Sequence, residues 1–539
     1  LAASFAWHQK SSSATASLGG VVKAGSGDVV VNAKVEHNLN AEGGAAAVGV
    51  VGVGAAIAYV DETSSAEAKL LDDTDITAQS LDVHGQSRTT SVASVIAAAG
   101  GIVSGAGADS NVSDTSGAHA TVGNKVKLSA PGGLAQIRAE SDPLAEADST
   151  GIAVSAGLSI GVSLADATVD TDTSVVVGDQ FNVTAGSLSL KAQTLSRTGQ
   201  KTASADSLAA GGGALVGAAA SESSASVLSK TLVQMGTGHE ITLAGAFDVL
   251  SKSTVSAYSN VSGVSVGIVA AGGNSADTVV NSRTEALIGA GIITAGSFVA
   301  RAEGHDELDA ASKSGAGGLG VLLAASVTND ADSVTTTRIG GTIRSATVDI
   351  DAKHTTDFQG TADSTSASVA GYSGAWVTNT VDNTTTAELA NGTRVENART
   401  FDMNAETVVT KGSAGADWTV QAASGGILSG ASGASYSTIH NDTHVVIGSN
   451  AFIDTSVAGL NSGAIRIGAK NDVDVYDAVL LDTGGAIAIA HTESFIKADR
   501  NDADVTVGAG TLLRSDGDIV LDAHTEAVVD TEAQSKTYG

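Results

Sequence analysis

The sequence predicts an all-β fold: a repeat β-solenoid, like a parallel β-helix, built from about ten units of about 54 residues. Three observations predict it, namely alternating aliphatic residues, strand landmarks at regular spacing, and composition. Only 2 of the 539 residues are proline, so backbone donors are free for uninterrupted ladders. Aromatic residues are 3% of the chain, so Val, Ile, Leu and Ala must form the core. Because stacked repeats share one core, we expect residues 1–539 to form a single continuous array.

The alternation is clearest in residues 151–192. From Ile152 to Leu164 every second residue is aliphatic, and the residues between them are Ala, Ser or Gly. A period of two is typical of an extended strand with two distinct faces. The aliphatic phase changes near Ala165, which predicts a bulge, bend or corner there. An exposed face would carry Lys, Glu or Thr, so we expect both faces of this stretch to be covered, by another wall of the solenoid or by a neighbouring molecule.

The units are recognised by a short strand that ends in a small residue and recurs at nearly regular intervals of about 54 residues. Its copies are Val29-Val31-Ala33, Leu81-Val83-Gly85, Ala135-Ile137-Ala139, Leu188-Leu190-Ala192, Phe247-Val249-Ser251, Phe298-Ala300-Ala302, Val348-Ile350-Ala352, Phe401-Met403-Ala405, Ile465-Ile467-Ala469 and Ile519-Leu521-Ala523. Upstream of most copies stands an aliphatic residue followed by glycine, which we expect to supply a positive φ or a tight corner. These pairs include Val122-Gly123, Val177-Gly178, Ile288-Gly289, Ile339-Gly340, Ile447-Gly448 and Val507-Gly508.

Glycine-rich apolar runs lie further upstream in most units, as in residues 43–58, 151–164 and 425–435. Each unit is therefore predicted to contain a long glycine-rich strand, a polar strand, a glycine corner and two short strands. Successive coils of a solenoid lie about 4.8 Å apart. One coil per unit would give an axis of roughly 48 Å, and three coils of about 18 residues would give roughly 140 Å. The long runs favour large coils, or two coils per unit.

Charge and cysteine content exclude several kinds of partner and site. The chain has 58 acidic and 28 basic residues, a net charge of −30, which disfavours nucleic acid and anionic membranes as partners. The absence of cysteine removes disulfides, thiolate chemistry and cysteine-ligated zinc. It is also common in large exported bacterial proteins. The chain starts at Leu1 without an initiator Met, and we expect it to be an excerpt of a longer protein whose export signals lie elsewhere.

The repeat patterns resemble the giant filamentous adhesins of bacteria, which include haemagglutinin-like and leukotoxin-type members. The segments that carry the resemblance are GGAAAVGVVGVGAA at 43–56, TEALIGAGIITAGSFVARA at 284–302 and RIGGTIRSATVDIDA at 338–352. The resemblance covers essentially the whole chain, through degenerate patterns that other secreted β-solenoids share. It implies export to the cell surface and a role in adhesion, aggregation or fibre formation, and it implies no catalytic residues.

Two motifs suggest a membrane segment and a hydrolase, and the repeat explains both differently. Residues 43–60 are apolar for most of their length, yet they hold five glycines and recur in other units, so we predict a buried strand and no membrane insertion. The G-x-S-x-G motif occurs around Ser159 and Ser265. In a hydrolase that serine sits on a strand-to-helix turn. Here both copies are expected inside a strand, in the same slot of the repeat, so we predict no enzyme.

Other segments of the sequence resemble nucleotide-binding and metal-binding motifs. Residues 315–320 fit the dinucleotide fingerprint G-x-G-x-x-G, but a strand-like run follows them where a helix is required. His440 and His444 would lie about 13 Å apart on a strand, too far for one metal. Acidic clusters and the segment 272–277 leave calcium possible, although no calcium-binding loop is present. We otherwise expect no cofactor.

Trp376 and Trp418 are the candidate contact residues. Both occur where other units carry small or aliphatic residues. An exposed tryptophan on a solenoid could stack on a sugar ring or anchor a protein partner. A larger core filler in an atypical unit is the alternative.

Three functions follow from these observations. The first is a non-catalytic extracellular segment of a filamentous adhesin, a rigid stalk on the bacterial cell surface. The second is a self-assembling subunit of a fibre or surface layer, packed through its flat Ala/Gly/Ser faces or its end coils. The third is a polysaccharide-acting enzyme on a β-helix. The expected partners are neighbouring repeats, further copies of the chain, and cell-surface glycans or proteins.

Overall fold

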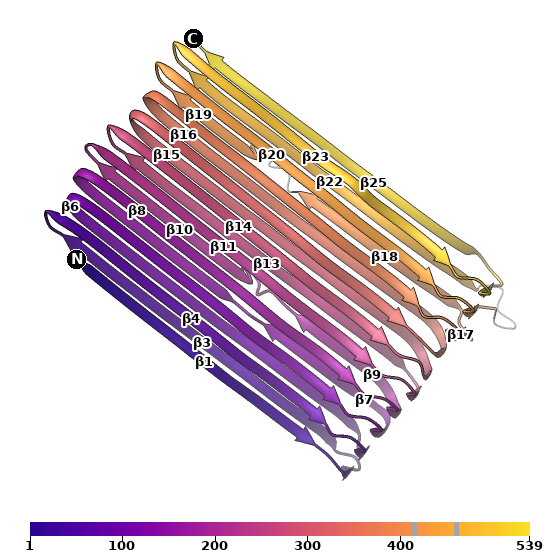
Figure 1. Cartoon of the computed structure of the whole chain (residues 1–539). Helices are drawn as coiled ribbons and strands as arrows, with labels where there is room; N and C mark the ends of the chain where they lie inside the picture. The colour runs from indigo at the N-terminus through magenta and orange to yellow at the C-terminus, as the bar shows by residue number, and fades with distance from the viewer. Residues whose placement is uncertain (412–417, 457–462) are drawn as a thin grey trace.

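The computed structural model describes residues 1–411, 418–456 and 463–539. Every regular element in this part of the chain is a β-strand, and all strand pairings are parallel. The strands stack coil upon coil from the N-terminus to the C-terminus, so the predicted parallel β-solenoid is confirmed (Figure 1). Each coil has two long walls, A and B, and a short wall C.

Wall A contains the strands that run toward a sharp bend. They are β3 (Asp28–Val48), β7 (Lys127–Asp142), β9 (Asn182–Thr194), β10 (Ala203–Gly213), β13 (Ala246–Val266), β18 (Thr400–Lys411), β19 (Val420–Gly425), β22 (Ala464–Gly484) and β25 (Ile519–Tyr538). Four longer elements continue through the bend into wall B. They are β6 (Ser80–Val122), β8 (Ala145–Val177), β15 (Ile292–Ile339) and β16 (Thr342–Leu389).

Wall B contains the strands that leave the bend, and wall C closes each coil with a short strand. The other wall B strands are β1 (Ala2–Leu18), β4 (Val51–Leu70), β11 (Val216–Met235), β14 (Val269–Ile288), β20 (Leu428–Ile447) and β23 (Ile487–Val507). Wall C contains β2 (Val21–Lys23), β5 (Asp75–Thr77), β12 (Glu240–Leu243), β17 (Arg394–Glu396), β21 (Phe452–Asp454), β24 (Leu512–Arg514) and the first residues of β7, β9, β15 and β16.

Each unit of the sequence forms one coil. Val51 on β4 pairs with Val103 on β6, and Val103 pairs in turn with Leu158 on β8. Each step of this ladder advances the chain by one whole unit, which favours one large coil over three coils of about 18 residues. At roughly 66 Å for a strand of about 20 residues and about 4.8 Å per coil, each coil is far wider than it is tall.

The strand landmarks stack on one another in register. Val29 pairs with Leu81, and the ladder continues through Phe247 and Phe298 to Ile465 and Ile519. The side chains of this ladder point into the space that the three walls enclose, where Phe181, Phe247, Phe298 and Phe401 are fully buried. Phe247 and Phe298 pack edge to face with ring centroids 5.6 Å apart. This end of the cross-section is therefore the thick end of the core.

Polar ladders fill the middle of the interior. Asn329 Nδ2 donates to Asn379 Oδ1 at 2.8 Å, and Asn379 Nδ2 donates to Ser437 Oγ at 2.9 Å. These residues occupy equivalent positions in successive coils. Each of these two amides is thus paired with an adjacent coil, which offsets the cost of burying a polar group.

The walls come closest together at the bend. A Cβ on Gly161 of wall B would overlap the carbonyl oxygen of Ala210 in wall A. On the two limbs of β8, the hydroxyls of Ser149 and Ser163 approach to 2.6 Å across the interior. In the coils around β8 the residues between the walls are therefore mostly Gly, Ala and Ser, whereas Val321, Leu323 and Leu481 point inward beside the bend in later coils. The covered small-residue face is therefore an internal seam of the solenoid, and it is not available for packing copies together.

Two expectations for residues 151–192 are wrong. The chain folds back between Ser155 and Leu158, where the pairing with β6 changes register, and the run is not one straight strand. No bulge or change of phase occurs at Ala165, since the odd-numbered residues face inward on both sides of it. Up to Leu164 the aliphatic residues are the even-numbered ones, which face outward. From Ala165 onward they are the odd-numbered ones, which face inward.

The same bend corrects the prediction of a buried strand at residues 43–60. The run spans the end of β3, the bend and the start of β4. Its small residues face inward, whereas Val48 and Val51 are exposed. The structure contains no helix long and apolar enough to cross a membrane within the described residues.

The corner glycines form tight corners but do not adopt a positive φ. A Cβ on Gly448 would lie 2.6 Å from the backbone nitrogen of Asn391 in the preceding coil, so close backbone approach excludes a larger residue. The positive φ occurs further along the corner, as at Asn450 with φ 58° and Gly392 with φ 72°.

Replacement of Gly161 by Val should destabilise the fold by about 3 kcal/mol or more, because the added side chain must force the walls apart. Gly212 on wall A serves as the control, because a Cβ added there would meet no atom within 4 Å. Gly212→Val should change the free energy of unfolding by no more than about 0.5 kcal/mol. Urea unfolding measures both, and equal effects would contradict the tight internal seam.

Candidate functional site

The two tryptophans lie on different walls and are half-buried. Trp376 faces outward from the wall B part of β16, and its ring lies back over Gly374 on the same strand. Trp418 precedes β19, a wall A strand, outside any regular element. Trp376 is thus a surface residue and not a core filler. The structure does not bring the two residues into one site.

The two G-x-S-x-G serines are sealed inside the solenoid. Ser159 and Ser265 are both fully buried and lie within strands, as predicted. They do not share a slot of the repeat, since Ser159 follows the bend in wall B and Ser265 precedes it in wall A. A fully buried hydroxyl between two closely packed walls has no access to a substrate.

The candidate nucleotide and calcium segments are parts of strands. Residues 315–320 belong to β15, which turns at the bend and continues as a strand. Residues 272–277 belong to β14, and the Asn274 side chain donates inward to the Lys313 carbonyl at 2.6 Å. No helix N-terminus or acidic loop is present at either segment.

The histidines of β20 each face a carboxylate of the next coil. His440 Nε2 lies 2.7 Å from Asp499 Oδ1, and His444 Nδ1 lies 3.5 Å from Asp504 Oδ2. The two histidines thus point to different carboxylates. Within the described residues, no group of three or more His, Asp or Glu side chains could hold a metal ion.

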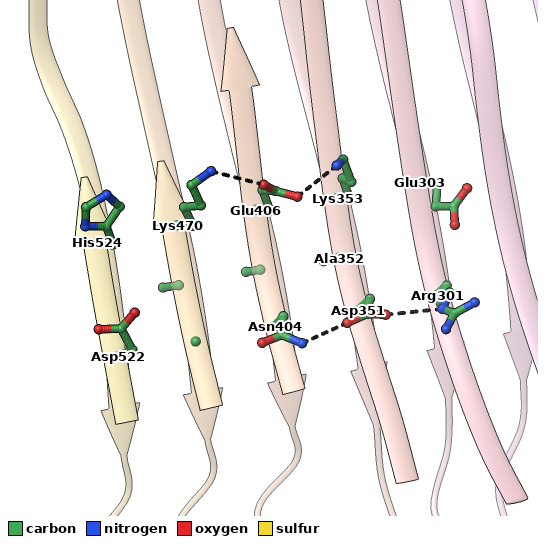
Figure 2. Close-up of a pocket in the computed structure, with 13 residues that line it drawn as sticks. Arg301, Glu303, Asp351, Ala352, Lys353, Asn404, Glu406, Lys470, Asp522 and His524 are labelled. Atoms are coloured by element: carbon green, nitrogen blue, oxygen red, sulfur yellow. Dashed lines mark hydrogen bonds and ion pairs between the residues drawn. The ribbon is translucent and has the colours of Figure 1, made fainter. Parts of the chain in front are cut away.

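A hollow of about 560 Å³ lies on the outer face of wall A across β15, β16, β18, β22 and β25 (Figure 2). It forms because Gly468 has no side chain between Asn404 and Asp522 in the same outward row. Charged and polar side chains project from neighbouring coils around this gap.

These side chains bind one another from coil to coil. Lys353 Nζ lies 2.8 Å and Lys470 Nζ 3.5 Å from the two carboxylate oxygens of Glu406. Burial alone would raise the pKa of Glu406, but the two lysines outweigh it and the pKa is lowered. In the row beside it, Asp351 accepts from Arg301 and Asn404, each at 3.2 Å (Figure 2). The hollow is therefore lined by a charge ladder that ties coils together.

A buried ion pair lies inside the solenoid. Lys411 Nζ donates to Asp477 Oδ1, and both side chains are almost completely buried. The hydroxyls of Ser435 and Ser437 each donate to Asp477 at 2.8 Å. Burial lowers the pKa of the Lys411 amine to about 7. No pattern in the sequence indicates this pair, since its members belong to different units and different strands.

Two carboxyl groups are stacked in the interior of wall B. Glu62 on β4 pairs in register with Asp114 on β6, and both side chains are fully buried. His37 Nδ1 contacts Glu62 Oε1 across the interior. Burial raises the pKa of Asp114 to about 7, and the Glu62 carboxylate adds to the increase. Asp114 is therefore protonated over much of the range in which aspartate is normally ionised.

An exposed apolar surface borders the bend on wall B, and we call it the apolar face. It consists of the first three outward-facing residues of each wall B strand after the bend. Its larger members are Val51, Val53, Val103, Leu158, Ile160, Val162, Val216, Val269, Leu322, Tyr372, Leu428, Ile487 and Ile489. It contains no Asp, Glu, Lys or Arg, and its polar members are Ser432 on β20 and His491 on β23. The alternating runs of the sequence include these residues, but alternation alone does not indicate that they are exposed.

No family model, curated protein or solved structure matches the chain.

Asp114→Asn should remove part of the dependence of stability on pH. The folded protein keeps the Asp114 proton up to about pH 7, whereas the unfolded chain releases it near 3.8. The wild type should therefore lose stability as pH rises through this window, by up to roughly 4 kcal/mol, and the variant should lose correspondingly less.

Urea unfolding between pH 4 and pH 8 measures this difference. Asp28→Asn, at an exposed position of wall A, is the control and should keep the wild-type dependence. Parallel curves for the wild type and Asp114→Asn would contradict the assignment.

Proposed function

We propose that this chain is a non-catalytic structural segment of an extracellular bacterial adhesin, in which stacked coils form a rigid support on the cell surface. The observation that carries the proposal is the in-register parallel stacking of its strands from β1 to β25. Its repeats also resemble those of filamentous adhesins. Stacked repeats of this kind form an extended, stiff scaffold from local contacts alone.

The dimensions of a coil favour a wide, flat solenoid over a long, thin fibre. About 54 residues advance the axis by only about 4.8 Å, while the long strands extend roughly 66 Å across it. A chain used only to reach outward would gain more length from small coils. The wide walls instead offer a large lateral surface, which supports a role in adhesion or aggregation.

The ladder of charges on wall A supports a structural role for its acidic residues. Glu406 and Asp351 are engaged by basic or amide side chains of adjacent coils. Carboxylates that act on a polysaccharide would instead stand free on either side of a sugar. This observation favours the adhesin segment over the enzyme.

The apolar face favours a self-assembling subunit as the second candidate. In that case the contact would use the outward aliphatic residues of wall B, because the flat Ala/Gly/Ser face is sealed inside. The two candidates are compatible if copies of an adhesin associate side by side.

Removal of one whole coil should leave both the fold and adhesion intact. Deletion of residues 51–102 joins Val50 to Val103, which occupies the same register position as Val51. Bacteria that display the full-length protein with this deletion should adhere and aggregate like the wild type, because a support tolerates the loss of one of many coils.

Deletion of residues 51–76 removes about half a coil and is the matched control. It should abolish surface display or folding, because the following strands lose their register. The reverse pattern, loss of adhesion in a folded whole-coil deletion, would assign a localised site to that coil. Absence of the protein from the cell surface would contradict the proposed function itself.

A further inference from the structure

The apolar face is too large and too regular to be a set of isolated exposed residues. It runs through nine successive coils, from Val51 to Ile487, and its three rows are spaced about 6.7 Å apart. These spacings give an area of roughly 900 Å². A stable protein interface buries about 800 Å² on each partner, so the face has the size that such an interface needs.

The face has a ridge next to a groove. Leu158, Ile160 and Val162 form the ridge on β8. Beside it, the second and third outward residues of β11 and β14 are Ala and Gly, and they form the floor of a groove of about 420 Å³. Leu322 and Tyr372 form the far wall of this groove. One strand with three large aliphatic side chains is thus followed by two strands that each carry one, Val216 and Val269 in the first row.

The distribution of charge around the bend favours a protein partner over a lipid surface. Wall A, on the other side of the same bend, carries Lys313, Asp363 and Asp482 at outward positions within its first three rows. A rim immersed in lipid would have to be uncharged on both sides, because charged groups are costly in hydrocarbon. Only wall B meets that requirement, so a flat one-sided contact fits better. The net charge of −30 also disfavours an anionic membrane.

We infer that the apolar face of wall B pairs with the same face of a second copy of this chain. In a two-fold contact the same patch serves both partners, so the β8 ridge of each copy lies in the β11–β14 groove of the other. The two solenoid axes then run in opposite directions. This pairing rests on the proposed function and extends it, because it names a second copy of the solenoid as the partner of wall B.

The acidic residues beyond the third row limit the contact to the apolar rows. Asp109 and Glu222 occupy the fourth outward position after the bend. Facing copies would bring such carboxylates toward one another. Dimerisation should therefore strengthen as salt screens the repulsion.

Sedimentation equilibrium of the purified chain tests the inference. The wild type should form a dimer, and Ile160→Asp combined with Leu322→Asp should raise its dissociation constant roughly 100-fold or more. Val154→Asp combined with Val264→Asp is the matched control, because these residues are similarly exposed on wall A near the same bend. The control should dimerise like the wild type. Circular dichroism checks that each variant is folded.

Directed cross-linking tests the ridge-to-groove arrangement, since the chain has no cysteine of its own. A mixture of Ile160→Cys and Ala271→Cys should form a mixed disulfide dimer faster than either variant alone forms a symmetric one. Preferential symmetric cross-linking would overturn the arrangement.

Three results would overturn the inference. They are a monomeric wild type, equal loss of the dimer in the wall A and wall B variants, and a monomer that binds zwitterionic phosphatidylcholine vesicles through Ile160 and Leu322. Each leaves the adhesion experiment with the whole-coil deletion unaffected. Conversely, a dimer that forms in solution from a protein absent from the cell surface would contradict the proposed function and leave the dimer standing.

Discussion

The register between successive coils is the constraint on which the rest of the structure depends. Every strand hydrogen-bonds to the equivalent strand of the next coil, so a residue type repeated in the sequence becomes a column in space. Val29 and Ile519 lie at opposite ends of one such column. A shift by one residue would turn the inward side chains outward along a whole wall, and the alternating pattern therefore fixes the register strongly.

The columns differ along the width of a coil, and this difference gives the cross-section its taper. Phenylalanines such as Phe247 and Phe298 fill the end closed by wall C, and amide columns such as Asn329–Asn379 fill the middle. At the bend the walls are held apart mostly by Gly, Ala and Ser, and Val321, Leu323 and Leu481 point inward only in later coils. Because so little space remains between the walls around β8, the aliphatic residues there lie on the outside. The exposed apolar face is thus a consequence of the tight internal seam.

The outer surface is divided in the same way. On wall A, Glu406 and its lysines join one coil to the next, and this charged region faces water. Near the bend on wall B, charges are missing over nine coils, and the surface is apolar. A single solenoid therefore presents a region suited to solvent and a region suited to another protein. This division agrees with a solenoid that makes contacts through its wide walls, as the proposed adhesin segment would.

The sequence by itself determined the fold class, the period and the register, because equivalent landmark residues recur at nearly constant spacing and can stack only in that order. It also placed Ser159 and Ser265 within strands. Alternation, however, shows only that two faces differ, and it does not show which of them is buried. The tertiary structure decided that question for Ile152 to Leu164, because the backbone of Ala210 from the next coil lies against Gly161 and leaves no room for larger side chains. The buried Lys411–Asp477 pair and the groove beside Ile160 were likewise beyond the sequence, since residues from separate coils form them.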